Sequence, residues 1–154
     1  MKKSTRLETL LAGLDPGPHD RGVAHDPRYT GWFTCFNAAE YYEAHDILEH
    51  LWLRTRDANH AFFKGLIQIA GAFVHLRKHF ERPSHPKDAS RLRPATRLLA
   101  RGAEHLEPFR PMHLRLDVAA VCSLCGKIAA AIEASAFTRN PWTPENAPRI
   151  ELAA

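Results

Sequence analysis

Two segments rich in apolar and aromatic residues, 36–54 and 62–80, constrain the fold more than any other part of the sequence. They read FNAAEYYEAHDILEHLWLR and FFKGLIQIAGAFVHLRKHF. When each is turned through about 100° per residue, its apolar side chains gather on one continuous arc, which is typical of an α-helix with a buried face. Because only a few residues join the segments, we expect the two helices to run antiparallel. The pair is therefore predicted to form the centre of a helical bundle.

The first of these helices carries polar residues of two kinds. Asn37 is a suitable N-cap, and Glu40 three positions later completes a capping-box pattern, so the helix is predicted to begin at Asn37 and end near position 55. Its apolar arc comprises Tyr41, Ala44, Ile47, Leu48, Leu51 and Trp52. Glu40 falls within this arc, and His45 lies beside it with Glu49 one turn further on. His45 and Glu49 are therefore candidates for a role other than solvation.

The second helix has a polar stripe interrupted by small residues. The stripe consists of Lys64, Gln68, Gly71, His75 and His79. Gly65, Gly71 and Ala72 lie on or beside it, and glycine inside a helix costs about 1 kcal/mol relative to alanine. We therefore expect another helix to approach closely here and to enclose Gln68 and His75.

The remaining elements follow from capping and breaker residues. Short helices are predicted over 4–14 and from Asp26-Pro27 to about Cys35, a longer one from Asp88 or Arg93 to Glu107, and a last one beginning at Asp117. Prolines forbid a regular helix after Thr138, so an extended Pro-rich tail anchored by Trp142 and Ile150 is expected. The predicted organisation is a short helix and flexible linker over 1–25, a helical bundle over 26–137 and a tail over 138–154. The fold class is all-α, a single-domain bundle of about five helices.

Composition bounds the class of protein. The chain has 154 residues, of which 45% are hydrophobic and 25% charged, enough for one domain with a substantial core. The formal net charge of +4 permits an acidic partner without requiring one. No apolar run follows Lys3 as in a signal peptide, and none approaches the roughly 20 residues of a membrane span. Three cysteines, an odd number, do not suit a disulfide framework, so we expect a reduced, cytoplasmic protein without membrane contact.

The pair of central segments resembles the domain-of-unknown-function 309 family of small bacterial and archaeal proteins. The resemblance rests on Phe36, Asn37, Glu40, Tyr41, Glu43, Ala44, His45, Leu48, Glu49 and Trp52, and on Gly65, Leu66, Ile67, Gln68, Ala70 and His75. It spans about residues 27–135, and it implies a compact helical bundle with no established activity. Pro94 departs from the family pattern, because it stands in what resembles a continuous helix and places the start or straightness of that helix in question.

Short motifs elsewhere give little support to a known chemistry. Cys122 and Cys125 form a CxxC, but the predicted cap at Asp117 places them inside a helix rather than at its N-terminus, on its apolar face. His75 and His79 have the spacing of zinc proteases without the glutamate that such a motif requires. Neither a nucleophile elbow nor a glycine-rich phosphate loop is present.

The polar residues of the central pair form the candidate functional cluster. Its members are Glu40, Glu43, His45, Glu49, Trp52, Gln68 and His75. One interpretation is a hydrogen-bonded network that satisfies buried groups and fixes helix register. A second is a metal site for zinc, iron or manganese with His45, Glu49 and His75 as ligands, serving a hydrolytic or redox enzyme. A third is a pocket for an organic ligand.

A basic helix gives a further alternative. Arg91, Arg93, Arg97 and Arg101 crowd one segment and would suit nucleic acid or phosphate. No stacking aromatic residue lies between Lys87 and Glu107, which disfavours binding to single strands. The sequence names no reaction and no ligand. It favours a non-enzymatic scaffold or interaction module with a buried Glu/His/Gln network, and it leaves homo-oligomerisation open.

Overall fold

The computed structural model describes residues 22–154, and this part of the chain is mostly α-helical. The elements are η2 (Val23–His25), α2 (Pro27–Asn37), α3 (Tyr41–Trp52), α4 (Asn59–Glu81), α5 (Leu92–Leu106), η3 (Glu107–Phe109), β1 (Met112–His113), β2 (Leu116–Asp117) and α6 (Val118–Ala134). The two short strands pair as an antiparallel hairpin at one end of the bundle. The predicted all-α class is confirmed. The short helix expected over 4–14 lies outside the described residues.

Capping residues begin two of the helices as the sequence predicts. The Asp26 carboxylate accepts a bond from the Arg28 backbone N–H at 2.8 Å, with Pro27 in the first helical position. Asp117 accepts from the Ala120 N–H at 2.9 Å and starts α6. Pro94 lies in the first turn of α5, where no intrahelical N–H bond is lost, so this proline marks the start of the helix and does not break it.

The predicted start of the first central helix was wrong. Helix α2 continues through Asn37, the chain turns at Ala38–Glu40, and α3 begins only at Tyr41, with no side-chain capping bond from Glu40. The turn needs Ala39 at φ 58° and is closed by a bond from the Glu40 N–H to the Cys35 carbonyl, 2.8 Å long. The longer α2 buries Phe36 completely, stacked on Trp32 at 4.8 Å between ring centroids. Burial of aromatic area therefore outweighs the local capping signal.

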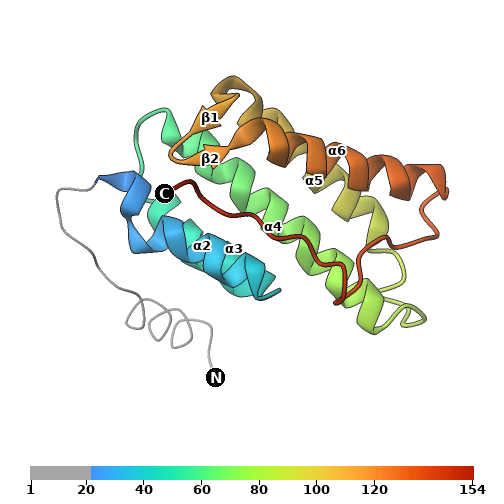
Figure 1. Cartoon of the computed structure of the whole chain (residues 1–154). Helices are drawn as coiled ribbons and strands as arrows, with labels where there is room; N and C mark the ends of the chain where they lie inside the picture. The colour runs from blue at the N-terminus through green and yellow to red at the C-terminus, as the bar shows by residue number, and fades with distance from the viewer. Residues whose placement is uncertain (1–21) are drawn as a thin grey trace.

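Helix α4 is the central element, with α2 and α3 on one side and α5 and α6 on the other (Figure 1). The start of α3 lies beside the end of α4, since the Arg77 guanidinium donates to the Ala39 carbonyl at 2.5 Å. The end of α3 lies beside the start of α4, where the Trp52 ring stacks on His60 at 4.7 Å. The antiparallel arrangement expected from the short connection is thus confirmed.

Helices α4 and α5 cross at a pair of glycines. A Cβ built on Gly65 would lie 2.9 Å from the Gly102 carbonyl oxygen, and one built on Gly102 would lie 2.6 Å from Ile69 Cγ1. Real Cβ atoms essentially never come within 3.0 Å of such atoms, so both positions require glycine for this approach. The packing role predicted for Gly65 is confirmed.

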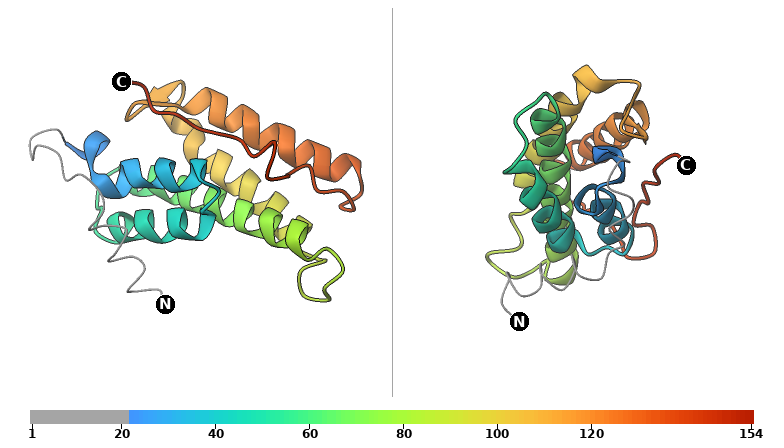
Figure 2. Two further views of the ribbon diagram at one scale, coloured as in Figure 1. Left: turned by 60° about the horizontal axis from the view of Figure 1, so that its bottom comes forward. Right: turned by 90° about the vertical axis from the view of Figure 1, so that its left-hand side faces the viewer.

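Residues 138–154 form an extended tail that runs back along the bundle between α2 and α6 (Figures 1 and 2). Trp142 and Ile150 are buried in it, as expected of anchors. Among residues 22–154, no helix combines the length and the apolar character that a membrane crossing requires.

Candidate functional site

His45 and Glu49 remain together on α3, close to a buried aspartate. His45 Nδ1 lies 3.2 Å from Asp46 Oδ1, and its Nε2 lies 4.0 Å from Glu49 Oε2. Asp46 is buried, whereas His45 and Glu49 are partly exposed. These three residues are neighbours in one helix, so both of these contacts of His45 are made within α3.

Trp52, the next member of the predicted cluster, joins α3 to the start of α4. Its ring stacks on His60, and the Lys64 ammonium lies over it at 5.4 Å from the centroid. The indole Nε1 is buried and has no hydrogen-bond acceptor among the described residues. The Trp52 ring thus contacts two basic side chains of α4, those of His60 and Lys64.

Gln68 and His75 face α5 rather than α3. Gln68 Oε1 lies 2.8 Å from His105 Nδ1, which is also 3.0 Å from the Arg101 carbonyl. His75 Nδ1 lies 2.9 Å from an Arg91 nitrogen and can only accept from that guanidinium. Both residues are therefore ties between α4 and α5, which partly enclose them as predicted.

Arg91 holds an ion-paired junction at the end of α4. Its Nε donates to the buried Asp88 carboxylate, and this bond lowers the Asp88 pKa although burial opposes the shift. Arg82 and His85 lie 3.7 Å from the same carboxylate. Burial, and then the charge of Arg91, lowers the pKa of His75. The junction fixes the loop between α4 and α5.

Glu40 and Glu43 line a separate pocket. This cavity of about 340 Å³ lies where the turn before α3 meets the second half of α4, and its lining residues are Ala39, Glu40, Tyr41, Tyr42, Glu43, Val74, Arg77, Lys78 and Glu81. Acidic and basic side chains are mixed around it, and Arg77 is already bonded to Ala39 and 3.6 Å from Glu81. The size is at the lower end of ligand pockets.

The structure does not bring the predicted cluster together. No hydrogen bond or ion pair among residues 22–154 joins His45 or Glu49 to Gln68 or His75, because α3 and α5 pack on different sides of α4. Within that range, no three His, Cys, Asp or Glu side chains are grouped so that they could hold a metal ion. The zinc, iron or manganese site proposed for His45, Glu49 and His75 therefore has no geometric basis among these residues.

The four arginines of the basic segment differ in their contacts. Arg91 is committed to Asp88, and the Arg93 guanidinium lies 4.1 Å from the centroid of the Phe137 ring. Arg97 and Arg101 remain exposed on α5. Arg91 is thus held in an ion pair, while Arg93, Arg97 and Arg101 follow one another at intervals of four residues on the exposed side of α5.

The three cysteines are free and buried. Burial raises the pKa of Cys125 to about 12 and also raises that of Cys122. A raised pKa makes the reactive thiolate scarce, which is the opposite of what a redox CxxC needs. Both residues fill the face of α6 that packs on α5.

Hydrogen bonds and a ring contact with distant parts of the chain hold the tail. We use the term tail seat for Asn37, Tyr41, Phe80 and Arg115, which contact it. The Asn37 amide nitrogen donates to the Ile150 carbonyl at 3.0 Å, and its amide oxygen accepts from the Ile150 N–H at 2.7 Å. Further along, the Ala153 N–H donates to the Arg115 carbonyl and the Arg115 side chain donates to the Ala153 carbonyl, both at 2.8 Å.

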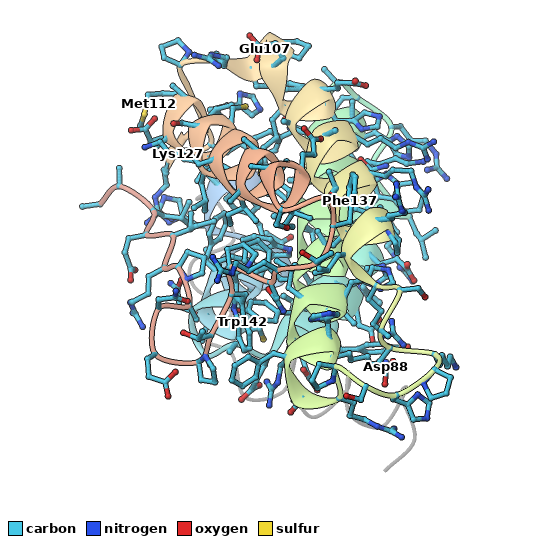
Figure 3. The ribbon with its side chains drawn as sticks, turned by 90° about the vertical axis from the view of Figure 1, so that its right-hand side faces the viewer. Asp88, Glu107, Met112, Lys127, Phe137 and Trp142 are labelled. Carbon is cyan, nitrogen blue, oxygen red and sulfur yellow. The ribbon has the colours of Figure 1, made fainter. Side chains whose placement is uncertain are left out.

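Trp142 anchors the other end of the tail (Figure 3). Its Nε1 donates to the Tyr41 hydroxyl at 2.9 Å, and its ring packs edge-on against Phe80 at 5.6 Å. Burial is the main cause of a raised pKa for Tyr41. Sequence reasoning identified Trp142 and Ile150 as anchors, but it missed the seat residues. Asn37 gave only a local capping signal, and its true partner lies 113 residues further along the chain.

Space remains on both sides of the tail. Cavities of about 180 and 260 Å³ lie between the tail and α6, lined in part by Leu124 and Pro148. A third of about 530 Å³ lies toward α2 and is lined in part by Thr30, Thr34 and Arg149. The tail is therefore held by a few strong anchors and not by continuous close packing.

Comparison with known proteins gives one match. Residues 31–84, from within α2 through α4, match the family model described as a domain of unknown function, DUF309. The match is narrower than the resemblance over 27–135. No curated protein and no solved structure matches the chain. Over the segment that contains α3 and α4, the chain is similar to the DUF309 family.

Proposed function

We propose that this protein is a non-enzymatic interaction module whose tail seat binds an extended peptide through the peptide main chain. The observation that carries the proposal is the pair of hydrogen bonds between the Asn37 side-chain amide and the backbone N–H and carbonyl of Ile150. In the structure the chain's own tail occupies the seat.

A side-chain amide suits this task because it carries a donor and an acceptor side by side. It can satisfy both main-chain groups of one residue in an extended segment, whatever the side chain of that residue is. Main-chain bonds of this kind supply affinity in peptide recognition, while pockets for individual side chains supply specificity. Here the contact of Trp142 with Tyr41 and Phe80 would supply the specificity.

The unfilled space beside the tail supports an exchangeable ligand. Grooves of about 180, 260 and 530 Å³ that are open to solvent flank the tail, so its sides are only partly covered by the bundle. Trp142 and Ile150 belong to the buried core, so an exchanged peptide must bury both side chains again. The polar pairs of α3, α4 and α5 serve as ties that fix the helices presenting the seat.

The cellular compartment is part of the proposal. All three cysteines are free and buried, which suits the reducing conditions of the cytoplasm. Among residues 22–154, no specific contact favours the metal-dependent or the nucleic-acid alternative.

The test is binding of a synthetic, fluorescein-labelled peptide of residues 138–154, followed by fluorescence anisotropy. The tail in cis competes at an effective concentration of about 1 mM for a short linker, so the wild-type chain should bind the peptide weakly. The full-length Trp142→Ala variant weakens that competitor and leaves the seat intact. It should bind the peptide at least about tenfold more tightly than the wild-type chain does.

Two controls make the outcome specific to the seat. A peptide carrying Trp142→Ala should lose binding, and so should a Trp142→Ala receptor that also carries Asn37→Ala. If Trp142→Ala lowers the helical circular dichroism signal, full-length Ile150→Ala replaces it as the receptor, because this change shortens the anchor and keeps the main-chain bonds. Equal binding of the wild-type and Trp142→Ala peptides, or no binding to either receptor, would refute the proposal.

A further inference from the structure

The hinge between α6 and the tail is strained. Ala136 and Phe137 have φ values of 54° and 61°, so two consecutive non-glycine residues adopt the left-handed conformation. This conformation brings the Cβ atom of a non-glycine residue too close to the following carbonyl. Leu114 and Arg115 in the β-hairpin turn are a second such pair. Bonds from the Ala136 N–H to the Glu133 carbonyl and from the Phe137 N–H to the Ile132 carbonyl hold the reversal, at 2.9 and 3.0 Å. The chain therefore turns back on the bundle at a cost that an open hinge would not carry.

The contacts that hold the tail do not require it to come from the same molecule. The seat residues come from four elements of the bundle. Asn37 lies at the end of α2, Tyr41 at the start of α3, Phe80 near the end of α4 and Arg115 in the β-hairpin. A second copy presents the same groups in the same arrangement. Further contacts in the hinge region are that of the Phe137 ring with Arg93 and the bonds from the Thr138 and Arg139 N–H groups to the Ser135 hydroxyl. Figure 3 shows Phe137 where α6 ends beside α5.

The geometry points to reciprocal exchange of residues 138–154 between two copies of this chain, each tail lying in the tail seat of the other. This inference rests on the proposed function and names the source of the peptide. The occupant is a second copy because the seat is complementary to this tail at Trp142, Ile150 and Ala153. Exchange keeps every one of those bonds, gives a closed twofold dimer and relieves two strained hinges, and strained hinge loops favour such swapping.

Two substitutions at Ala136 test the hinge in opposite directions. The residue is exposed, so neither change disturbs the core. Glycine accepts a positive φ without strain and should keep the tail in cis. Proline is fixed near a φ of about −65°, cannot adopt the observed turn and should open the hinge.

The measurement is molar mass by size-exclusion chromatography with light scattering, on the full-length chain over a range of concentrations. The wild-type dimer should appear as the protein approaches the effective cis concentration of about 1 mM. Ala136→Pro should be dimeric at about 10 µM, a hundredfold lower concentration. Ala136→Gly should dimerise at least about tenfold more weakly than the wild-type chain, since only Phe137 remains strained at each hinge and less strain is relieved by exchange.

Limited trypsin digestion shows where the tail lies in the dimer. Arg149 bonds to the Asn37 carbonyl when the tail is seated, so cleavage after Arg149 should be slow in the Ala136→Pro dimer and fast in any molecule with a loose tail. A monomeric Ala136→Pro variant, a dimer with a rapidly cut tail, or equal dimerisation of Ala136→Gly and wild type would each overturn the exchange. Peptide binding in trans alongside a monomeric Ala136→Pro variant would retain the proposed function and reject only the exchange.

Discussion

The crossing of α4 and α5 allows one substitution to be predicted in sign and size. In Gly65→Ala the new methyl group would lie 2.9 Å from the Gly102 carbonyl oxygen, 3.0 Å from Leu106 Cδ2 and 3.1 Å from His105 Cβ. The Leu106 terminus can rotate away. The Gly102 oxygen belongs to the helix backbone and cannot, so the two helices must move apart along the most extensive helix contact of the described chain.

Two contributions of opposite sign determine how much Gly65→Ala changes the free energy of unfolding. Alanine is favoured over glycine inside a helix by about 1 kcal/mol. Overpacking a close contact costs about 1–3 kcal/mol, and the rigid backbone partner places this case in the upper half of that range. The net effect of Gly65→Ala is then a loss of about 1–2 kcal/mol in the free energy of unfolding, or a fall in Tm of about 2–8 °C for a chain of this size.

Gly126 on α6 provides the matched control. A Cβ there would meet no heavy atom within 4 Å, and the residue is exposed, so only the helix-propensity term applies. Gly126→Ala should therefore raise stability by about 1 kcal/mol. Urea denaturation followed by circular dichroism measures both variants against the wild-type chain. A Gly65→Ala variant as stable as Gly126→Ala would refute the close crossing of α4 and α5.

Three further predictions concern the site, the histidines and the thiols. Asn37→Ala should lower the free energy of unfolding by about 1–2 kcal/mol, because two main-chain bonds to the tail are lost, and trypsin should then release the tail faster; unchanged digestion would contradict the anchoring role. Burial and Arg91 lower the folded-state pKa of His75 below the unfolded value of about 6.5, so stability is fully present above that pH and is lost as pH falls towards the folded-state pKa. Urea midpoints should accordingly be lower at pH 5.5 than at pH 7.5, and His75→Gln should reduce the difference, although three other histidines share the direction of shift. Cys122 and Cys125 should resist a thiol reagent in the native protein and react after denaturation, since burial raises both pKa values, and rapid native reaction or a disulfide would contradict this.

Local signals in the sequence determined the helices and several of their contacts. Asp26 and Asp117 predict helix starts because a capping carboxylate accepts a hydrogen bond from a backbone N–H only two or three residues further along the chain. Gly65 stood out because glycine costs stability inside a helix unless something must approach it closely. Trp142 and Ile150 stood out as large apolar residues in a segment whose prolines exclude a helix. Each of these inferences depends on a short stretch of chain.

Only the tertiary structure decided how the polar residues are grouped. Helical periodicity showed that His45, Glu49, Gln68 and His75 were unusual, but it could not show which neighbour each one faces. Helices α3 and α5 pack on different sides of α4. His45 and Glu49 therefore contact each other on α3, whereas Gln68 and His75 bond to His105 and Arg91. Asn37 illustrates the same limit, since its amide could satisfy a helix terminus nearby or a main chain 113 residues away. Which partner it takes depends on the whole bundle, because burying Phe36 extends α2 past the local cap and leaves the Asn37 amide facing the tail.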